Sequence, residues 1–277
     1  MSNAKVWFVT GASKGLGLSL VTQLLAAGQK VAATSRKKDE LVKAVDNNAD
    51  NFLPLQVDLV NEESVAAALA DTHQRFGRID VIVNNAGYGI GGSIEELTDA
   101  ETREAFDINV FATLNVIRKA MPYLRAQRAG HIINISSIAG FTANTGWGIY
   151  AAAKFAIVGM SEVLAQDVRP LGIHVTVVAP GAFRTSFLTE GSLVLTGNPI
   201  EEYHEVRATH QKYKQMDGVQ AGDPEKAAKA MIEITAMDEP PVYLLLGDDA
   251  YERAFRKMDV MSNAFKRMET LTKSTGF

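Results

Sequence analysis

Residues 10–17 read TGASKGLG, and they stand between the apolar segment Val6–Val9 and a helical pattern that runs from Leu16 to Ala27. A strand, a glycine-rich turn and a helix in this order open a layered α/β fold. Glycines allow a tight turn, let backbone N–H groups approach a pyrophosphate and bring a helix N-terminus to negative charge. The spacing differs from GxGxxG, so a plain strand-to-helix turn is the alternative interpretation. The position directly after the first strand favours a phosphate-binding loop.

Short apolar segments alternate with candidate helical regions along the chain. Seven strands are expected, at Val6–Thr10, Lys30–Thr34, Phe52–Val57, Val81–Asn84, His131–Ser136, His174–Ala179 and Val242–Leu246. Continuous apolar strands between helices predict a mostly parallel sheet that is covered on both faces. The expected fold class is therefore α/β, a doubly wound Rossmann-like fold with a seven-stranded parallel sheet. Its ligand crevice should lie at the carboxyl ends of the strands.

A chain of this length can form one unit, so we expect a single Rossmann-like domain over residues 1–277. The alternation breaks at about 183–222, where a turn-rich part and the polar stretch Ile200–Gln215 predict a flap over the crevice. A surface insertion without ligand contact is the alternative. At about 248–277 we expect a helical extension with apolar residues at helical spacing. This stripe would complete the pocket, contact another subunit or simply pack on the body.

The composition restricts the possible functions. The chain has no cysteine and a formal charge of −4. The absence of cysteine excludes disulfides and zinc-thiolate sites, and we expect no metal site. The negative charge gives no general attraction to nucleic acid or to an anionic membrane. No N-terminal stretch has the length of a signal peptide or a membrane span, so the expected location is cytoplasmic.

The residues after the second expected strand indicate which nucleotide would bind. A site for NAD usually presents an acidic residue there, whereas this chain has the basic run Arg36–Lys38. Arg36 and Lys14, the lysine of the glycine loop, can bracket a ribose 2′-phosphate through charge-assisted hydrogen bonds. A basic run that solvates a helix start is the alternative. The sequence predicts NADP(H) as the cofactor.

The segment YAAAK places Tyr150 and Lys154 one helical turn apart on one face. A phenol with a pKa of about 10 is a poor proton shuttle at neutral pH, but a nearby ammonium and an oxidised nicotinamide would stabilise its phenolate. Ser137 follows the fifth expected strand at the carboxyl edge of the sheet, where its hydroxyl can hold a substrate oxygen. Tyr and Lys at this spacing also occur by chance, so the neighbouring motifs give the pair its meaning.

Several motifs together resemble those of the short-chain dehydrogenase/reductase family over roughly residues 5 to 247. They are TGASKGLG, Asp58, NNAG at Asn84–Gly87, Asn109, Ser137, YAAAK, and PGAFRT at Pro180–Thr185. The likeness is closest to the core one-domain branch, and the long C-terminal region is similar to that of 17β-hydroxysteroid and retinol dehydrogenases. The family motif often carries serine before the lysine, where this chain has Ala153.

The resemblance implies a cofactor site in which Asp58 lies near the adenine, Asn84 beside the adenosine ribose and Thr185 at the nicotinamide amide. The implied contacts are Gly11, Ser13, Lys14, Gly15, Leu16, Gly17, Arg36, Asp58, Asn84, Ala86, Gly87, Tyr150, Lys154, Pro180, Gly181 and Thr185. Asn109 would complete a catalytic set with Ser137, Tyr150 and Lys154 by anchoring a water that relays protons to Lys154. The family also implies a homodimer or homotetramer, built through the two long helices around Ala100–Arg128 and Ile149–Arg169.

The expected function is NADP(H)-dependent interconversion of a carbonyl and a secondary alcohol by hydride transfer, with Tyr150 as general acid/base. A small apolar substrate would meet Ser137 and Tyr150 in a pocket lined by Tyr88, Ile138, Trp147, Phe183, Phe187 and Leu188, although such residues also pack cores and lids. A catalytically silent NADPH-binding redox sensor is the alternative. The spacing of Thr10–Gly17 disfavours an epimerase or dehydratase, and no histidine stands in a hydrolase motif.

Overall fold

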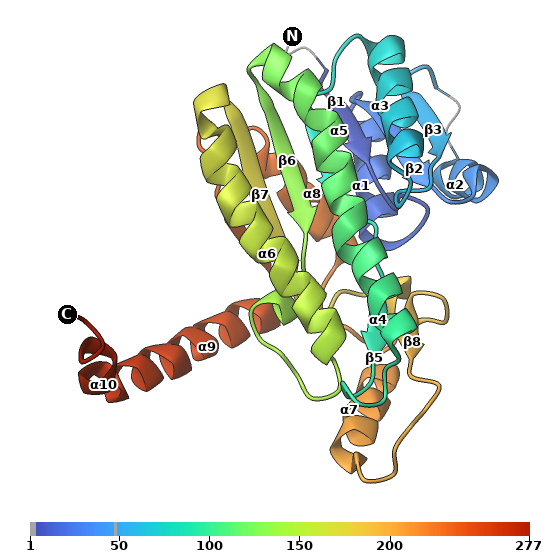
Figure 1. The fold of residues 1–277 in the computed structure, drawn as a ribbon. Helices are drawn as coiled ribbons and strands as arrows, with labels where there is room; N and C mark the ends of the chain where they lie inside the picture. Colours follow the sequence, from blue (N-terminus) through green and yellow to red (C-terminus); the bar gives the residue numbers. More distant parts are fainter. Residues whose placement is uncertain (1–3, 47–48) are drawn as a thin grey trace.

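The computed structural model describes residues 4–46 and 49–277, and a seven-stranded parallel sheet forms its centre (Figure 1). The strand order is β3-β2-β1-β4-β6-β7-β9. The strands are β1 (Val6–Val9), β2 (Lys30–Ser35), β3 (Phe52–Gln56), β4 (Val81–Asn84), β6 (Gly130–Ile135), β7 (Ile173–Pro180) and β9 (Tyr243–Leu246). The predicted seven parallel strands are confirmed, and their ends differ from the prediction by one residue at most.

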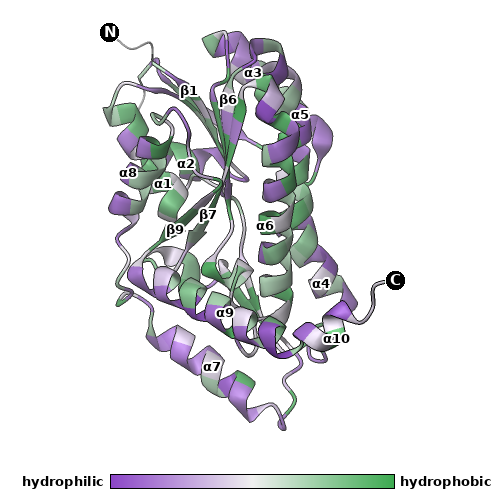
Figure 2. Ribbon diagram, turned by 90° about the vertical axis from the view of Figure 1, so that its left-hand side faces the viewer, coloured by the Kyte–Doolittle hydropathy of each residue, from purple (hydrophilic) through white to green (hydrophobic). Residues whose placement is uncertain are grey.

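Helices cover both faces of this sheet, and Figure 2 shows their apolar sides turned toward it. One face carries α1 (Gly15–Ala26), α2 (Lys38–Val45) and α8 (Pro224–Ile234). The other carries α3 (Glu62–Phe76), α5 (Ala112–Gln127) and α6 (Gly148–Val168). Successive side chains of a strand point to opposite faces, so Trp7 and Val9 pack in the first layer and Phe8 in the second. Burial of both faces explains why the strands are continuously apolar.

The strand order reverses direction between β1 and β4. After β1 the chain moves outward to β2 and β3, and after β4 it moves to the opposite side through β6, β7 and β9. The loops that follow β1 and β4 therefore leave the sheet in different directions and open a crevice at their carboxyl ends. The predicted position of the ligand site follows from this topology.

A second, two-stranded sheet was missed by the sequence analysis. β5 (Gly89–Gly91) pairs in parallel with β8 (Leu193–Leu195), which lies within the predicted flap. Both strands have three residues, and two of the three in β5 are glycines, which lack strand propensity. The pairing joins the flap to the loop after β4. The flap helix α7 (His204–Gln215) begins four residues later than the polar stretch suggested.

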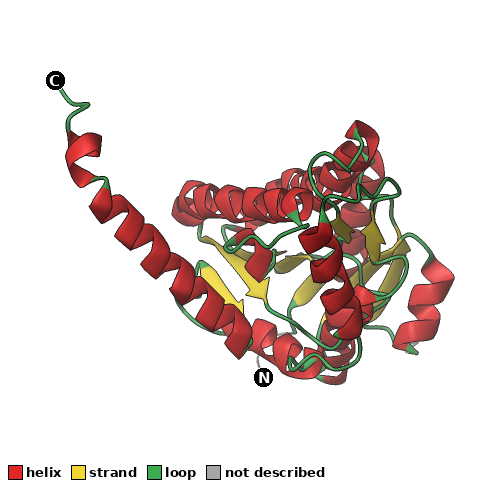
Figure 3. Cartoon of the chain, turned by 90° about the horizontal axis from the view of Figure 1, so that it is seen from below, coloured by secondary structure: helices red, strands yellow, loops and turns green. Residues whose placement is uncertain are grey.

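The C-terminal extension is a long helix, α9 (Asp248–Arg267), followed by the short α10 (Glu269–Lys273). Its first turns pack on the body, where Ala250 and Ala254 are buried against Ile138. Beyond them the helix runs away from the body (Figure 3). Phe255, Met258 and Phe265 are 46%, 51% and 66% exposed, so the interpretation of the stripe as simple packing is wrong for the outer part of the helix.

The segment Gly148–Leu171, which contains α6, has the length and hydropathy of a membrane-spanning helix. In this structure it covers the sheet instead, because it packs on β7 and buries Ile157, Val158 and Val177 in one cluster. It also buries the amino group of Lys154. The apolar composition of this segment is thus explained by its packing in the core.

Candidate active site

The glycine loop is fixed to the loop after β4 by backbone geometry. Gly11 has a φ of 63°, and a side chain there would bring a Cβ atom to 2.8 Å from the Cα atom of Ala86. The Thr10 hydroxyl accepts hydrogen bonds from the backbone N–H groups of Asn85 and Ala86, at 3.0 and 3.1 Å. The loop needs glycine for this close approach. The result is a rigid turn at the N-terminus of α1.

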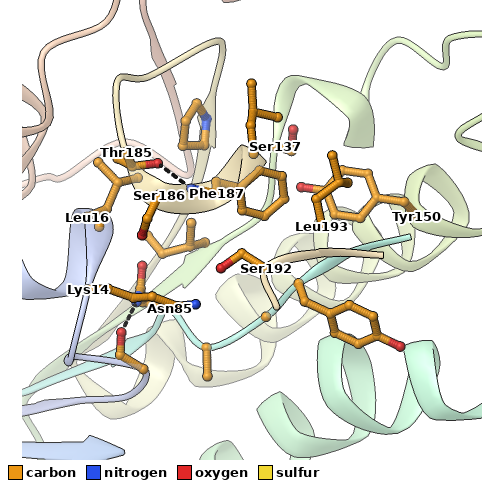
Figure 4. Close-up of a pocket in the computed structure, with 18 of the residues that line it drawn as sticks. Lys14, Leu16, Asn85, Ser137, Tyr150, Thr185, Ser186, Phe187, Ser192 and Leu193 are labelled. Atoms are coloured by element: carbon orange, nitrogen blue, oxygen red, sulfur yellow. Dashed lines mark hydrogen bonds between the residues drawn. The ribbon is translucent and has the colours of Figure 1, made fainter. Parts of the chain in front are cut away.

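One cavity of about 610 Å³ extends from this loop across the ends of the strands. Its lining includes the predicted residues Gly11, Ser13, Lys14, Gly15, Leu16, Arg36, Asp58, Ala86, Gly87, Ser137, Trp147, Tyr150, Pro180, Gly181, Phe183, Thr185 and Phe187. Figure 4 shows Lys14 and Asn85 toward one side and Tyr150 toward the other, with Phe187, Ser192 and Leu193 of the flap between them. The structure thus brings the predicted cofactor loop and the predicted catalytic tyrosine to one space.

At one end of the cavity lie Lys14, Arg36 and Asp58. Within the described chain, neither Lys14 nor Arg36 forms an ion pair, whereas Lys37 pairs with Glu40 at 2.7 Å. The buried Thr34 hydroxyl, also in the cavity lining, has no hydrogen-bond partner among the described residues. Asp58 accepts a hydrogen bond from the N–H of Val60 at 3.0 Å. This end therefore offers two unpaired cations and an unpartnered hydroxyl.

Asn84 lies outside the cavity lining, as do two other predicted cofactor contacts, Gly17 and Lys154. Its side chain is buried in β4 and donates a hydrogen bond to the Oδ1 atom of Asn134 at 2.8 Å. The cavity is lined by the next residue, Asn85, whose amide also donates to the carbonyl oxygens of Thr10 and Gly11, at 3.0 and 2.9 Å. Successive side chains of a strand alternate in direction, so a motif gives the segment but not the residue that faces the ligand. Gly17, also outside the lining, lets α1 approach Asn85.

Tyr150 lies in the first turn of α6 with its ring at the cavity and 9% of its surface exposed. Burial raises the pKa of its phenol to about 12, although a hydrogen bond with Ser137 lowers it in part. Ser137 follows β6, and its hydroxyl accepts a hydrogen bond from the N–H of Ala139 at 3.1 Å. The two hydroxyl groups lie near one another (Figure 4). At neutral pH the phenol is therefore protonated and can donate a proton.

Lys154 is buried one turn further along α6, with its Nζ atom 5.7 Å from the centroid of the Tyr150 ring. The ammonium donates a hydrogen bond to the carbonyl oxygen of Ile135 at 3.1 Å. Burial lowers the pKa of Lys154 to about 8. The amine thus changes its charge much closer to neutral pH than a free lysine, beside the group that would transfer a proton.

Asn109 lies in a single turn of π-helix, Asp107–Phe111, between α4 (Asp99–Phe106) and α5. Its Oδ1 atom accepts a hydrogen bond from the N–H of Tyr88 at 3.2 Å, and its amide donates to the carbonyl oxygen of Ala105 at 3.0 Å. A Cβ atom on Gly87 would lie 2.7 Å from that Oδ1 atom and 3.5 Å from the Nζ atom of Lys154. Asn109 and Lys154 therefore face the same glycine from two elements.

The flap forms the remaining wall. Phe187 packs on Tyr150 with ring centroids 6.0 Å apart, and Trp147 packs on His210 and Tyr213 of α7, at 5.0 and 4.9 Å. All of Tyr88, Ile138, Trp147, Phe183, Phe187 and Leu188 line the cavity. The sequence analysis missed the lining residues Asn144, Ser192, Leu193, Tyr213, Met216, Gln220, Asp249 and Arg253. No local pattern in the sequence marked these residues, because contacts between distant segments bring them to the cavity.

A buried ion pair fastens the flap to the body. The Glu96 carboxylate, with a fully buried side chain, accepts hydrogen bonds from the Nη2 atom of Arg207 at 2.5 and 2.6 Å. It also accepts the N–H groups of Ser93 and Ile200, each at 2.8 Å. Burial alone would raise the pKa of Glu96, but these hydrogen bonds lower it to about 2. The carboxylate is thus charged at all ordinary pH values and anchors α7.

The part of the chain that carries this geometry matches known proteins. Residues 5–192 match the family described as short chain dehydrogenase. An oxidoreductase of Botryotinia fuckeliana, BOA17, is 34% identical over 97% of this chain and 98% of its own. A 3-ketodihydrosphingosine reductase of Bacteroides thetaiotaomicron is 35% identical over 88% of each chain. A crystal structure of a short-chain dehydrogenase from Streptomyces avermitilis superposes with a TM-score of 0.91 and 34% identity over the full length of both chains.

The chain therefore belongs to the short-chain dehydrogenase family and is an oxidoreductase of that family. The resemblance predicted from the motifs is confirmed at this level.

Proposed function

We propose that this protein is an NADP(H)-dependent oxidoreductase that interconverts a carbonyl and a secondary alcohol, with Tyr150 as the general acid/base. One observation carries the proposal: a single cavity joins the glycine loop to Tyr150 and Ser137. Cofactor and substrate can then bind next to one another, and direct hydride transfer requires this contact.

The residues present fit a dinucleotide phosphate. Gly11 leaves a space that a Cβ atom would fill, and the N-terminus of α1 would stabilise a bound negative charge. Lys14 and Arg36 are unpaired cations that suit a ribose 2′-phosphate, within the described part of the chain. Thr185, near Gly15, would hold the nicotinamide end. When bound, NADPH supplies the hydride.

The chain's own residues supply the proton. Ser137 orients the substrate oxygen and stabilises negative charge on it, and the protonated phenol of Tyr150 donates to the same oxygen. The Lys154 ammonium binds the nicotinamide ribose and, as a nearby positive charge, lowers the cost of forming the phenolate. Asn109, next to Gly87 and close to Lys154, would hold the water that returns a proton to this group.

The substrate is proposed to be a small molecule with an apolar body. Phe183, Phe187 and Leu188 surround its place with apolar surface, and residues 183–222 would act as the flap that excludes water. A steroid, a retinoid or a smaller ketone would each suit such walls, as the resemblance to 17β-hydroxysteroid and retinol dehydrogenases suggests. We further propose a homo-oligomer through α5 and α6. Phe155 and Val163 of α6 are 44% and 56% exposed.

The test is oxidation of NADPH and of NADH against a panel of ketones, aldehydes, quinones and steroids. We expect the wild-type protein to turn over at least one of these compounds with NADPH, and we expect Tyr150→Phe to lose this activity. Tight binding of NADPH with no turnover across the panel would contradict it and would favour a redox sensor instead.

A further inference from the structure

Arg253 lies in the second turn of α9, where the helix passes the cavity, and it lines that cavity. Its neighbour Ala254 is buried against Ile138, the residue after Ser137. The guanidinium is held beside the turn that follows Ser137, because its Nη2 atom donates to the carbonyl and hydroxyl oxygens of Thr142, at 3.2 and 2.8 Å. Arg253 thus faces the substrate part of the cavity rather than the cofactor end.

The partners of this guanidinium are neutral. Turning the side-chain amide of Asn144 brings its oxygen to 3.2 Å from the same Nη2 atom. Across residues 4–46 and 49–277, no carboxylate forms an ion pair with Arg253, and the Nε and Nη1 groups have no hydrogen-bond partner. A guanidinium carries five N–H donors in a planar fork. Three of them are free for a ligand, and the charge has no counterion among the described residues.

Asp249, one turn earlier on α9, is the carboxylate nearest in sequence that also lines the cavity. Its Oδ2 atom accepts the N–H of Ala182 at 3.0 Å. That bond directs the carboxylate to the loop after β7, away from an ion pair with Arg253. The cation is therefore not neutralised by its neighbour on the helix.

The polar groups around Arg253 form one end of the substrate part. The Asn144 amide contacts the Tyr213 hydroxyl at 2.7 Å, and Tyr213 lies close enough to Tyr150 to raise the pKa of its phenol slightly. The same lining also contains the apolar residues Ile138, Leu188 and Met216. The substrate part therefore combines the reacting Tyr150, apolar side chains and a cation.

We propose that Arg253 and Asn144 form an anion subsite that binds a carboxylate of the substrate, so that the substrate class is an apolar oxo acid. The inference rests on the proposed function, since Tyr150 defines the reacting end. A carboxylate can accept a charge-assisted hydrogen bond from the free Nη1 or Nε group of this guanidinium, which fixes the position of the acid end of the substrate. A free neutral ketone would lack this anchor.

The experiment compares oxo acids of increasing chain length with their methyl esters, as substrates for NADPH oxidation. The wild-type protein should prefer the acid at one optimum length. Arg253→Gln keeps a donor for Thr142 but removes the charge, and the preference of acid over ester in kcat/KM should fall about ten- to a hundredfold, the range for a charged hydrogen bond. Arg253→Lys should keep part of it. The control is Arg256→Gln, an exposed position of the same helix.

Equal losses for acid and ester in Arg253→Gln would overturn the subsite and would make Arg253 an anchor of α9. Reduction of esters without preference for any acid would also overturn it, while the proposed function would stand. If no compound is reduced, calorimetry of acid and ester with the cofactor-loaded protein decides. Tighter binding of the acid, lost in Arg253→Gln, supports the subsite, whereas equal binding overturns it.

Discussion

The two walls of the cavity are built in different ways. The sheet wall, formed by Gly11–Leu16, Arg36, Asn85–Gly87, Ser137 and Tyr150, stands on strand ends and tight backbone turns. The flap wall, formed by residues 183–222 and the first two turns of α9, is fastened by the short β5–β8 pairing and by side chains such as Glu96 and Arg207. Backbone turns on a large parallel sheet tolerate little change, whereas a wall held by two three-residue strands and by side chains can vary. The sheet wall therefore suits a constant cofactor and the chemistry, and the flap wall suits selection of the substrate.

If the sheet wall carries the chemistry, the substitution with the largest effect on the reaction rate should lie in the sheet wall. Tyr150→Phe removes the proton donor and keeps the ring that packs on Phe187. We expect kcat/KM for carbonyl reduction to fall about a hundred- to ten-thousandfold, the range for general acid catalysis, with NADPH affinity unchanged. Steady-state rates measure kcat/KM, and a fluorescence titration measures the affinity for NADPH. A variant that retains most of its rate would show that the phenol is not the acid.

The choice of cofactor should also depend on the sheet wall. Arg36→Asp places a negative charge where the 2′-phosphate is proposed to lie. NADPH affinity should fall about ten- to a hundredfold, because a charged hydrogen bond is lost, while NADH affinity should hold or improve. Titration with each cofactor checks this. The matched control is Lys37→Asp, since Lys37 pairs with Glu40 at the surface. Equal losses of affinity for NADPH and NADH would show that Arg36 does not bind the 2′-phosphate.

The flap wall should affect the substrate more than the cofactor. Glu96→Gln keeps the shape of the side chain but leaves Arg207 without its buried counterion. We expect KM for the carbonyl substrate to rise about tenfold, because α7 loses its anchor and a charged hydrogen bond is worth roughly this factor. The dissociation constant of NADPH should not move. If KM for the carbonyl substrate and the dissociation constant of NADPH both rise, the flap wall also affects the cofactor, which contradicts the proposed division between the walls.

The smallest expected effect is a change with pH. Burial lowers the pKa of Lys154 to about 8, so the free protein loses this ammonium as the pH rises through that value rather than near 10.5. Since the protonated form is the one that assists Tyr150, kcat/KM should be constant below this pH and fall above it. In Lys154→Arg, whose side chain stays charged, the residual activity should show no such fall. An alkaline limb that persists in this variant would belong to another group.

The same difference between the walls explains how far the sequence could be interpreted. The strands, the glycine loop and the positions of Ser137 and Tyr150 follow from local patterns, because strand ends of a parallel sheet meet at one edge. The strands β5 and β8 did not follow, since a pair of three-residue strands depends on contacts between distant segments. Asn84 was placed in the right loop, but its strand turns the side chain into the sheet. The role of Arg253 could not be predicted, because the helical period of the sequence does not show which charged side chain lines the cavity without a counterion.

The most direct test of the account uses NADPH that carries deuterium at the transferable position of its nicotinamide ring. With a carbonyl substrate that the protein reduces, mass spectrometry of the product locates the label. We expect deuterium on the carbinol carbon of the alcohol, and slower formation of the labelled alcohol in Tyr150→Phe. Alcohol without label at that carbon, or labelled alcohol formed equally fast by the variant, would contradict the claim that hydride and proton meet in this one cavity.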